Sequence, residues 1–422
     1  MQAGNSMPLP ADELTVMIRA GSKIAARRIP SATPLPTSMG QGYAAEAATR
    51  DAATLWGLPD FVYEAGEQRV GPGTRELGDG ILIIGELGIV LQVKSRAALS
   101  SDPEKERRWL GKNITQALAQ GAGTIRQLER QPAALTNLRG RTIDVDGNDH
   151  RWLIVVVIDH PDPPAGLQPP LAEAHPAVVL LRRDWEFLFD QLKSTHAVGQ
   201  YCERVAGEPL ELGTEPLRYY DLASADAETE PEVLDGPGPT ISAPLLPLAP
   251  AGSDDLEAHY MVREVLEAIA SPRSLVANET DRLRVLAELD RLPVGHRANI
   301  GRFLLASMEE VLPGPTGQIV WRMRSLRGPA GQAHLGFAVS SRSHSEELQD
   351  LFGWWVQLRH NDALTTRGDL EDLTTVGVLL TPRDEGEKWD TTMAAISGDP
   401  KFSEEELATL REIWPTQSPP AT

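Results

Sequence analysis

The stretch RELGDGILIIGELGIVLQVKSR, residues 75–96, decides how the first half of the chain folds. Its apolar runs predict two short strands joined by a tight turn. Asp79 opens the first strand, and the second strand ends in a polar run from Gln92 to Arg96. Because side chains alternate along a strand, we expect Gln92 and Lys94 on one face and Val93 on the other, in the core. The hairpin therefore brings an acid and a Gln-x-Lys pair together at its open end, which we call the mouth of the hairpin.

The three polar side chains at this mouth have the chemistry of a site for a hard metal ion. The Asp79 carboxylate and the Gln92 carbonyl oxygen can share Mg²⁺, which takes oxygen ligands. Lys94 can then hold the attacking water and offset the charge that develops on a phosphate. The alternative is a surface hairpin with a solvated lysine, because a short motif of this kind also occurs by chance.

The composition is that of a multidomain globular protein whose charge is unevenly spread. The chain has 422 residues, enough for two or three domains, with 41% hydrophobic and 24% charged residues. Residues 1–150 hold 17 basic and 17 acidic residues, so the formal charge of −20 comes entirely from the later part of the chain. A local basic face for nucleic acid can therefore exist in the hairpin region. The single cysteine, Cys202, excludes an internal disulfide and predicts a cytoplasmic protein, and we see neither a membrane span nor a secretory signal.

Helical and strand patterns in the first half predict an α/β domain. Leu14, Met17, Ile18 and Ile24 suggest a short amphipathic helix over residues 11–28, followed by a proline-rich segment. Further helices are predicted over residues 42–56 and 103–131, and a helix or helix pair over residues 184–205 with Asp184 as its cap. Strands are predicted at residues 61–65, 75–96, 151–161 and 177–183. The order is helix, three strands, helix, two strands and helix, and the domain is expected to end near residue 222.

A linker separates this domain from a second one. Residues 223–254 are acidic and then proline-rich, a composition that buries little apolar surface. Residues 255–415 show three helical patterns, then strand-like segments and another helix, so an α+β domain is expected there. Residues 1–39 remain as a helix and proline-rich lead, and residues 416–422 as a tail. The acidic balance of the second domain favours a protein partner over nucleic acid.

The first domain resembles the PD-(D/E)xK nuclease superfamily, especially its restriction-endonuclease-like, Mrr-type branch. In that family a helix bearing Glu precedes a hairpin bearing Asp and (D/E/Q)-x-Lys, and a helix and further strands follow. Here the helix GYAAEAATRDAATLW supplies Glu46, GDG supplies Asp79, and LQVKS supplies Gln92 and Lys94. The resemblance covers roughly residues 40–205 and implies a restriction-endonuclease-like αβββαβ core with a mixed sheet.

The resemblance also implies roles for individual residues. The implied ligands of Mg²⁺ or Mn²⁺ are Asp79, Gln92, the main-chain carbonyl of Val93, and Glu46, while Lys94 would orient the attacking water. The implied substrate contacts are Lys112 and Gln116, one turn apart on the long helix, and Arg96. Two positions depart from the family pattern: Gly78 stands where the family has proline, and Gln92 stands where glutamate is usual. A neutral amide oxygen binds a metal ion more weakly than a carboxylate does.

The resemblance implies a metal-dependent nuclease that hydrolyses phosphodiester bonds, in DNA rather than RNA, with a role in defence or repair. The alternative is a catalytically inactive nuclease-like module that binds nucleic acid or protein. A third reading is a structural interaction protein, in which the site side chains diverge. No membrane partner is expected. A homodimer is compatible with the resemblance, because restriction-type enzymes often need two active sites to cut both strands.

Overall fold

The computed structural model describes residues 13–414 except 21–22, 65–66, 71–72, 77, 173, 229–245, 249–252, 272–278, 313–318, 327–332, 368–372 and 384–387. It divides into two compact units, residues 1–230 with 244–251 and residues 231–243 with 252–422. The division falls within the predicted linker, and the predicted lead belongs to the first unit. Most of the linker and the tail at 416–422 lie outside the described residues.

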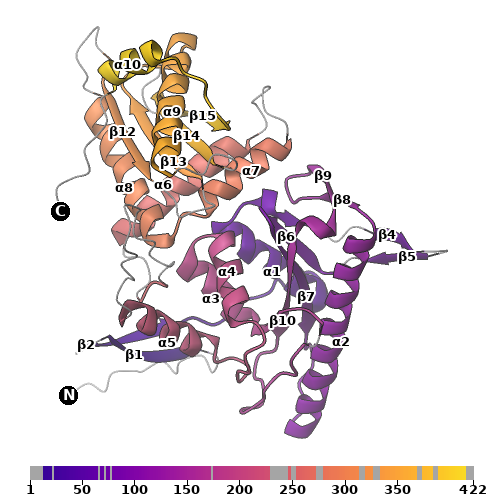
Figure 1. The fold of residues 1–422 in the computed structure, drawn as a ribbon. Coiled ribbons are helices and arrows are strands. Elements are labelled where there is room, and N and C mark those ends of the chain that lie inside the picture. The colour runs from indigo at the N-terminus through magenta and orange to yellow at the C-terminus, as the bar shows by residue number, and fades with distance from the viewer. Residues whose placement is uncertain are drawn as a thin grey trace, which may run out of the picture. The chain divides into compact units, whose positions relative to one another are not determined.

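A five-stranded mixed sheet forms the centre of the first unit (Figure 1). Its order is β11 (Ala177–Leu181), β10 (Arg151–Asp159), β7 (Leu87–Ser95), β6 (Gly80–Ile84) and β3 (Val62–Tyr63). The first three strands are parallel, whereas β6 runs antiparallel to both β7 and β3. The predicted α/β class and the predicted hairpin are confirmed, and β10 is buried over most of its length, as its continuous apolar sequence predicts.

Helices cover both faces of this sheet. On one face lies α2 (Pro103–Arg130), where Ile114 and Val90 belong to the same buried cluster. The other face is covered by α1 (Gln41–Trp56), α3 (Arg182–Leu192) and α4 (Thr195–Val205). There, a methyl group added to Gly199 of α4 would overlap the side chain of Leu87. Because side chains alternate along a strand, the even-numbered residues of β7 face α2 and the odd-numbered ones face α1 and α4.

The segment predicted as a helix over residues 11–28 is a β-hairpin. In it β1 (Leu14–Ala20) pairs antiparallel with β2 (Lys23–Ile29), and β1 packs beside α5 (Glu215–Glu228). Val16 and Ile18 are buried on the inner face, whereas Met17 is 65% exposed. The helical prediction was wrong because it counted Met17 as part of a buried stripe, while the buried residues repeat every second position.

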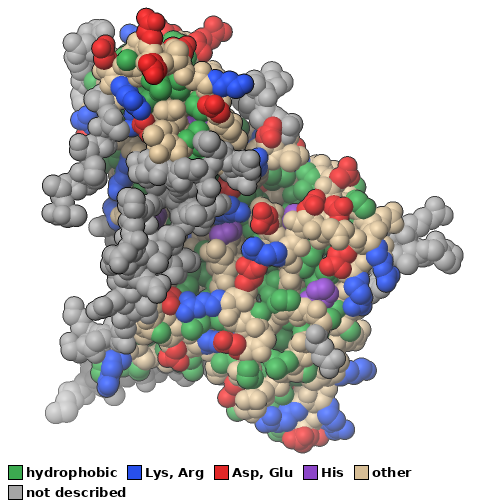
Figure 2. All heavy atoms as spheres, viewed as in Figure 1, with side chains coloured by type: hydrophobic (Ala, Val, Ile, Leu, Met, Phe, Trp, Pro, Cys, Tyr) green, Lys and Arg blue, Asp and Glu red, His purple; other side chains and the backbone are tan. Residues whose placement is uncertain are grey.

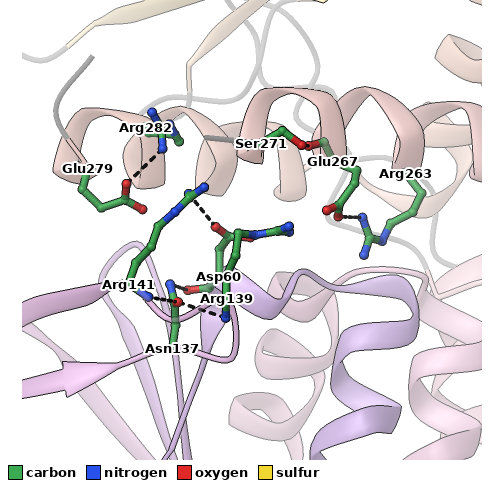
Figure 3. A network of polar contacts seen from close by, with 9 residues as sticks. All are labelled: Asp60, Asn137, Arg139, Arg141, Arg263, Glu267, Ser271, Glu279 and Arg282. Carbon is green, nitrogen blue, oxygen red and sulfur yellow. Dashed lines mark hydrogen bonds and ion pairs between the residues drawn. The ribbon is translucent and has the colours of Figure 1, made fainter. Parts of the chain in front are cut away.

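A buried ion-pair network attaches another hairpin to the sheet (Figure 3). This hairpin consists of β8 (Ala133–Thr136) and β9 (Thr142–Val145), and it follows α2; a third hairpin, β4 (Glu67–Val70) and β5 (Gly73–Glu76), precedes β6. Arg139 Nε and Arg141 Nη1 donate to the fully buried carboxylate of Asp60 at 2.7 and 3.1 Å. Asp60 lies in the 3-10 helix η1 (Pro59–Phe61) that leads into β3, and Asn137 donates to its carbonyl at 3.2 Å. The two guanidinium groups offset the cost of burying this carboxylate.

Element ends near α3 and α5 differ from the sequence prediction. Of the predicted helix or helix pair over residues 184–205, the structure has the pair, α3 and α4, separated at Lys193, which has a φ of 57°. The N-cap of α3 is Leu181, and Asp184 is instead fully buried in the first turn, where it pairs with Arg183. Burial raises the pKa of Asp184 to about 6, although the charge of Arg183 opposes the rise. Helix α5 continues to Glu228, so the first domain extends past residue 222 into the predicted linker.

The second unit contains a four-stranded mixed sheet of order β12 (Trp321–Leu326), β13 (His334–Ser340), β14 (Thr374–Pro382) and β15 (Trp389–Ser397). Strands β13 and β14 are parallel and the other neighbours are antiparallel. The first three strands match predicted segments, whereas β15 was not predicted. Its sequence, WDTTMAAIS, is only weakly apolar, and its residues are half-buried or exposed.

Helices also flank this second sheet. The N-terminal helices are α6 (Ser253–Ala270), α7 (Glu279–Asp290) and α8 (Val294–Val311), and α9 (Glu346–Arg367) and α10 (Glu404–Ile413) follow later in the chain. Phe352 and Trp355 of α9 stack and pack with Ala338 and Leu379 of the sheet. Figure 3 shows two ion pairs of this unit, Arg263 with Glu267 in α6 and Arg282 with Glu279 in α7. None of the described helices combines the length and apolarity that crossing a membrane requires.

The contact between α6 and α8 depends on the absence of a side chain at position 301. A methyl group on Gly301 would lie 2.7 Å from the Cα of Ala258 and closer still to its carbonyl group. We expect Gly301→Ala to force the helices apart and to destabilise the second unit by about 1–3 kcal/mol or more. Gly295→Ala in the same helix meets no atom within 4 Å and should be neutral or slightly stabilising. Urea unfolding of both variants measures the difference, and equal stability would contradict the predicted overlap.

Candidate metal and substrate site

The structure brings Asp79 to the second strand of the hairpin. The pairing of β6 with β7 begins at Gly80 and Leu91, and the backbone N–H of Asp79 donates to the carbonyl of Leu91 at 3.2 Å. The Asp79 carboxylate in turn accepts a hydrogen bond from the backbone N–H of Val93 at 2.5 Å. The carboxylate therefore lies against the strand that carries Gln92 and Lys94.

Gly78 has a conformation that proline cannot adopt. Its φ of 119° lies in the region that favours glycine, whereas a proline ring holds φ near −65°. A Cβ at this position would also lie 2.9 Å from the Nε2 atom of Gln92. The departure from the family's proline thus has a local cause: the chain turns here in a left-handed conformation directly beside the Gln92 amide.

Gln92 and Lys94 lie on the same side of β7, as the alternation predicts. Both face the α2 side of the sheet, whereas Val93 is buried on the other side. Gln92 is only 2% exposed, and Lys94 is half-buried. The side chain of Lys94 has no hydrogen-bond or ion-pair partner among the described residues. Its ammonium group is therefore available to a ligand.

Helix α1 adds a residue that the sequence reasoning missed. Arg50 Nη1 donates to the main-chain carbonyl of Asp79 at 2.7 Å, and the stem of Arg50 packs over Gly80. Glu46 lies one helical turn before Arg50, so the two side chains leave α1 on the same side, and Glu46 is half-buried. The sequence carries no motif for Arg50, because its partner is a main-chain carbonyl.

The carboxyl ends of β7 and β10 meet in a second polar cluster. Asp159 accepts hydrogen bonds from Ser95 Oγ at 2.7 Å, from Arg182 Nε at 2.9 Å and from Gln41 Nε2 at 3.3 Å. Burial raises the pKa of Asp159, but these hydrogen bonds and the charge of Arg182 outweigh it, and the pKa ends below its usual range. The cluster connects the end of β7, one residue beyond Lys94, to α1 and α3.

Arg96, predicted to contact the substrate, is held by an ion pair. Its Nε and Nη2 atoms donate to the two oxygens of Glu106 at 3.0 and 2.8 Å, and its guanidinium lies 5.0 Å from the ring centre of Trp109. His160 Nε2 also lies 3.0 Å from the same carboxylate, which is 4% exposed. Chiefly because of the Arg96 hydrogen bonds, and despite burial, the pKa of Glu106 falls to about 2. Arg96 therefore anchors α2 to the end of β7.

Lys112 and Gln116 do not lie on the side of α2 that packs against the hairpin. Both side chains are exposed, and both lie on the opposite side of the helix from the buried Ile114. The outward face of α2 carries them into solvent. Their contact with a substrate stays a prediction.

The oxygen atoms at the hairpin are of the kind that a hard cation binds. A strand residue directs its N–H and C=O to the same side, so the carbonyl of Val93 points toward Asp79, as its N–H does. The pairing with β6 ends at Leu91, which leaves this carbonyl outside the β6 ladder. Asp79, Gln92 and this carbonyl would offer Mg²⁺ one carboxylate and two neutral oxygens. Glu46 belongs to α1, which covers the sheet face opposite the one that Gln92 faces, so its role as a ligand stays a prediction. Within the described part of the chain, no three His, Cys, Asp or Glu side chains form a metal cluster.

Comparison with models of known protein families, with curated proteins and with solved structures finds no match. The functional argument therefore rests on the geometry of the first unit.

The Glu106 ion pair predicts an acid-dependent loss of stability. The pKa of Glu106 is lowered from 4.5 to about 2 in the folded state, so its contribution is complete above pH 4.5 and is lost as the pH falls toward 2. We expect Glu106→Gln to unfold at a lower temperature than the wild type at pH 7, and the difference to shrink below pH 4.5. Glu104→Gln, at an exposed position of the same helix, is the control and should change little. A difference as large at pH 3 as at pH 7 would contradict the assignment.

Proposed function

We propose that the first unit is a metal-dependent nuclease that hydrolyses phosphodiester bonds, in DNA in preference to RNA. The observation that carries this proposal is the hydrogen bond from the Val93 amide to the Asp79 carboxylate. It joins an acid at the start of one strand to a Gln-x-Lys segment at the end of the next, the arrangement that the PD-(D/E)xK resemblance implies. The chemistry of these groups suits a phosphate substrate.

The order and direction of the elements support a restriction-endonuclease-like core. Along the chain, α1, β3, β6, β7, α2 and β10 follow one another as helix, three strands, helix and strand, with two inserted or appended hairpins outside this series. The three strands before α2 form an antiparallel meander, and β10 then adds in parallel to β7. This is the αβββαβ order expected for residues 40–205.

Asp79, Gln92, Glu46 and the Val93 carbonyl would hold Mg²⁺ or Mn²⁺, which would supply positive charge near the phosphate and make a bound water more acidic. Lys94 faces the same side as Gln92, so its ammonium can donate to the attacking water or to a phosphate oxygen. Arg50 holds the backbone of Asp79 in place through its carbonyl. The ion pairs of Asp159 and Arg96 fix the end of β7, which limits how far Lys94 can move.

The second candidate is an inactive nuclease-like module that binds nucleic acid or protein. The observation that favours it is Gln92, which is 2% exposed and offers a neutral amide where a carboxylate is usual. In this case the second unit would serve as an interaction surface for a protein partner. A homodimer, a role in defence or repair and a cytoplasmic location belong to the first proposal.

Removing the Lys94 ammonium tests the catalytic proposal. We expect Lys94→Ala to lower Mg²⁺-dependent cleavage of duplex DNA by about 100-fold or more, because one charge-stabilising donor is worth that much in comparable sites. The fold should persist, since Lys94 has no partner among the described residues. Lys388→Ala, an exposed lysine of the second unit, is the matched control. If the wild type cleaves neither DNA nor RNA with Mg²⁺ or Mn²⁺, the catalytic proposal fails.

Replacing the Gln92 amide by a carboxylate separates an active site from a decayed one. Without metal, Gln92→Glu buries an additional charge and should lower the melting temperature relative to the wild type. Adding Mg²⁺ should raise the melting temperature of Gln92→Glu more than that of the wild type, because the metal binds the folded state. A strong gain of cleavage from a silent wild type would favour the inactive module. If neither Mg²⁺ nor Mn²⁺ changes the melting temperature of either protein, the metal site is refuted.

A further inference from the structure

The outward face of α2 carries a row of basic side chains. The row consists of Lys105, Arg108, Lys112, Arg126 and Arg130, and all five are exposed. At 100° per residue these positions fall within an arc of roughly 60° around the helix axis. We call this arc the basic row of α2. Figure 2 shows blue side chains along the edge of the molecule that α2 forms.

Acidic residues are absent from the basic row. The acids of α2 are Glu104, Glu106 and Glu129, and all three lie outside the arc. Glu106 is buried against Arg96, and Glu104 lies 3.7 Å from Arg107, which is also outside the row. Among the described residues, none of the five basic side chains forms an ion pair with a carboxylate. The row is therefore a surface of positive charge without ion pairs of its own, flanked at its two ends by Glu104, four residues before Arg108, and Glu129, three residues after Arg126. It lies in a chain whose formal charge is −20.

The spacing within the row is unfavourable for an ordinary solvated helix. Arg108 and Lys112 are four residues apart, as are Arg126 and Arg130, and like charges at this spacing destabilise a helix. A surface that serves only solubility places acids at these positions and gains stability from the pairs. The repulsion is relieved when a polyanion binds along the row.

The dimensions of the row match one turn of a nucleic-acid duplex. Lys105 and Arg130 are 25 positions apart in the helix, which is about 37 Å at 1.5 Å per residue. One turn of B-form DNA is about 34–36 Å long. Between the two basic groups the outward face shows Thr115, Gln116 and Ala119, so nothing repels a phosphate there, and the Gln116 amide can donate to one.

The row begins beside the candidate site. Glu106, in the first turn of α2, is bound to Arg96, which lies two residues after Lys94 on β7. The group formed by Lys105, Arg108 and Lys112 is therefore at the end of α2 nearest the hairpin mouth. A duplex that lies along the outward face of α2 would reach the site by extending past this end of the helix.

We propose that the basic row of α2 binds the sugar–phosphate backbone of duplex DNA and holds it next to the hairpin site. This inference rests on the proposed nucleic-acid function but not on cleavage. An anionic membrane is disfavoured, because none of the large exposed hydrophobic side chains in the described part of the chain lies on α2, and a membrane-binding helix needs an apolar face.

The proposal is tested by measuring how tightly the protein binds a fluorescein-labelled DNA duplex of about 30 base pairs, or three helical turns. Binding is followed by fluorescence anisotropy in EDTA, which prevents metal-dependent cleavage. The variant is Lys112→Gln/Arg126→Gln/Arg130→Gln, in which glutamine retains helix propensity. We expect affinity to fall about 100-fold or more at about 0.1 M salt, and the slope of log K against log salt to decrease by about 2.7. The matched control is Arg322→Gln/Arg383→Gln/Arg411→Gln, an equal charge change at exposed arginines of the second unit, which should bind as the wild type does.

The outcomes separate this proposal from the catalytic one. If Lys94→Ala binds DNA as tightly as the wild type but no longer cleaves it, both proposals are supported. A wild type that binds DNA in a salt-dependent way that requires the basic row, but cleaves nothing, is a different result. That result supports DNA binding by the row and refutes the catalytic proposal. An unchanged salt slope in the α2 variant overturns the row, as does an equal loss in the control. Tighter binding to vesicles of anionic phospholipid than to DNA, or no binding to DNA at all, also overturns it.

Discussion

The hydrogen bond between the Val93 amide and the Asp79 carboxylate is the contact on which the candidate site depends. It fixes where the acid lies relative to the Gln-x-Lys segment of β7. Two neighbours support it from either side of Asp79. Gly78 allows the left-handed turn that leads the chain into β6, and Arg50 holds the carbonyl of Asp79. A site of this kind functions only when such supporting groups fix the reacting ones.

The parallel pairing of β7 with β10 has a second effect on the site. Parallel strands end at the same edge, so Ser95 and Asp159 meet there and form one cluster with Arg182. On the α2 side, Arg96 and Glu106 form the corresponding attachment. Lys94, whose side chain has no partner among the described residues, therefore lies on a strand whose end is held by ion pairs to helices on both faces. The ordered end of the strand lowers the conformational entropy that a bound substrate must remove.

Much of this arrangement follows from local patterns, and the rest depends on tertiary contacts. The hairpin at 75–96 was predicted from its continuous apolar runs, and the long helix from Pro103 from apolar residues that repeat with the helical period. The apolar residues in 14–18 fit both the helical period and the strand period of two, so the pattern alone could not separate a helix from the observed strand. Strand β15 escaped prediction because its faces are only half-buried. Arg50 acts through a main-chain carbonyl, and no side-chain motif records such a contact. The network of Arg96 was equally invisible, since it joins two elements through Glu106.

Strand β7 changes its character halfway along its length. From Leu87 to Leu91 it has a neighbour on each side, β6 and β10, and is an interior strand. From Gln92 to Ser95 only β10 accompanies it among the described strands, and on the other side it is an edge. Open edges invite pairing with foreign strands and are usually blunted by charge or by a covering segment. Here the Asp79 carboxylate takes the amide that a foreign strand would need, and Lys94 supplies a charge. The groups that would handle a phosphate thus also protect the sheet from unwanted partners.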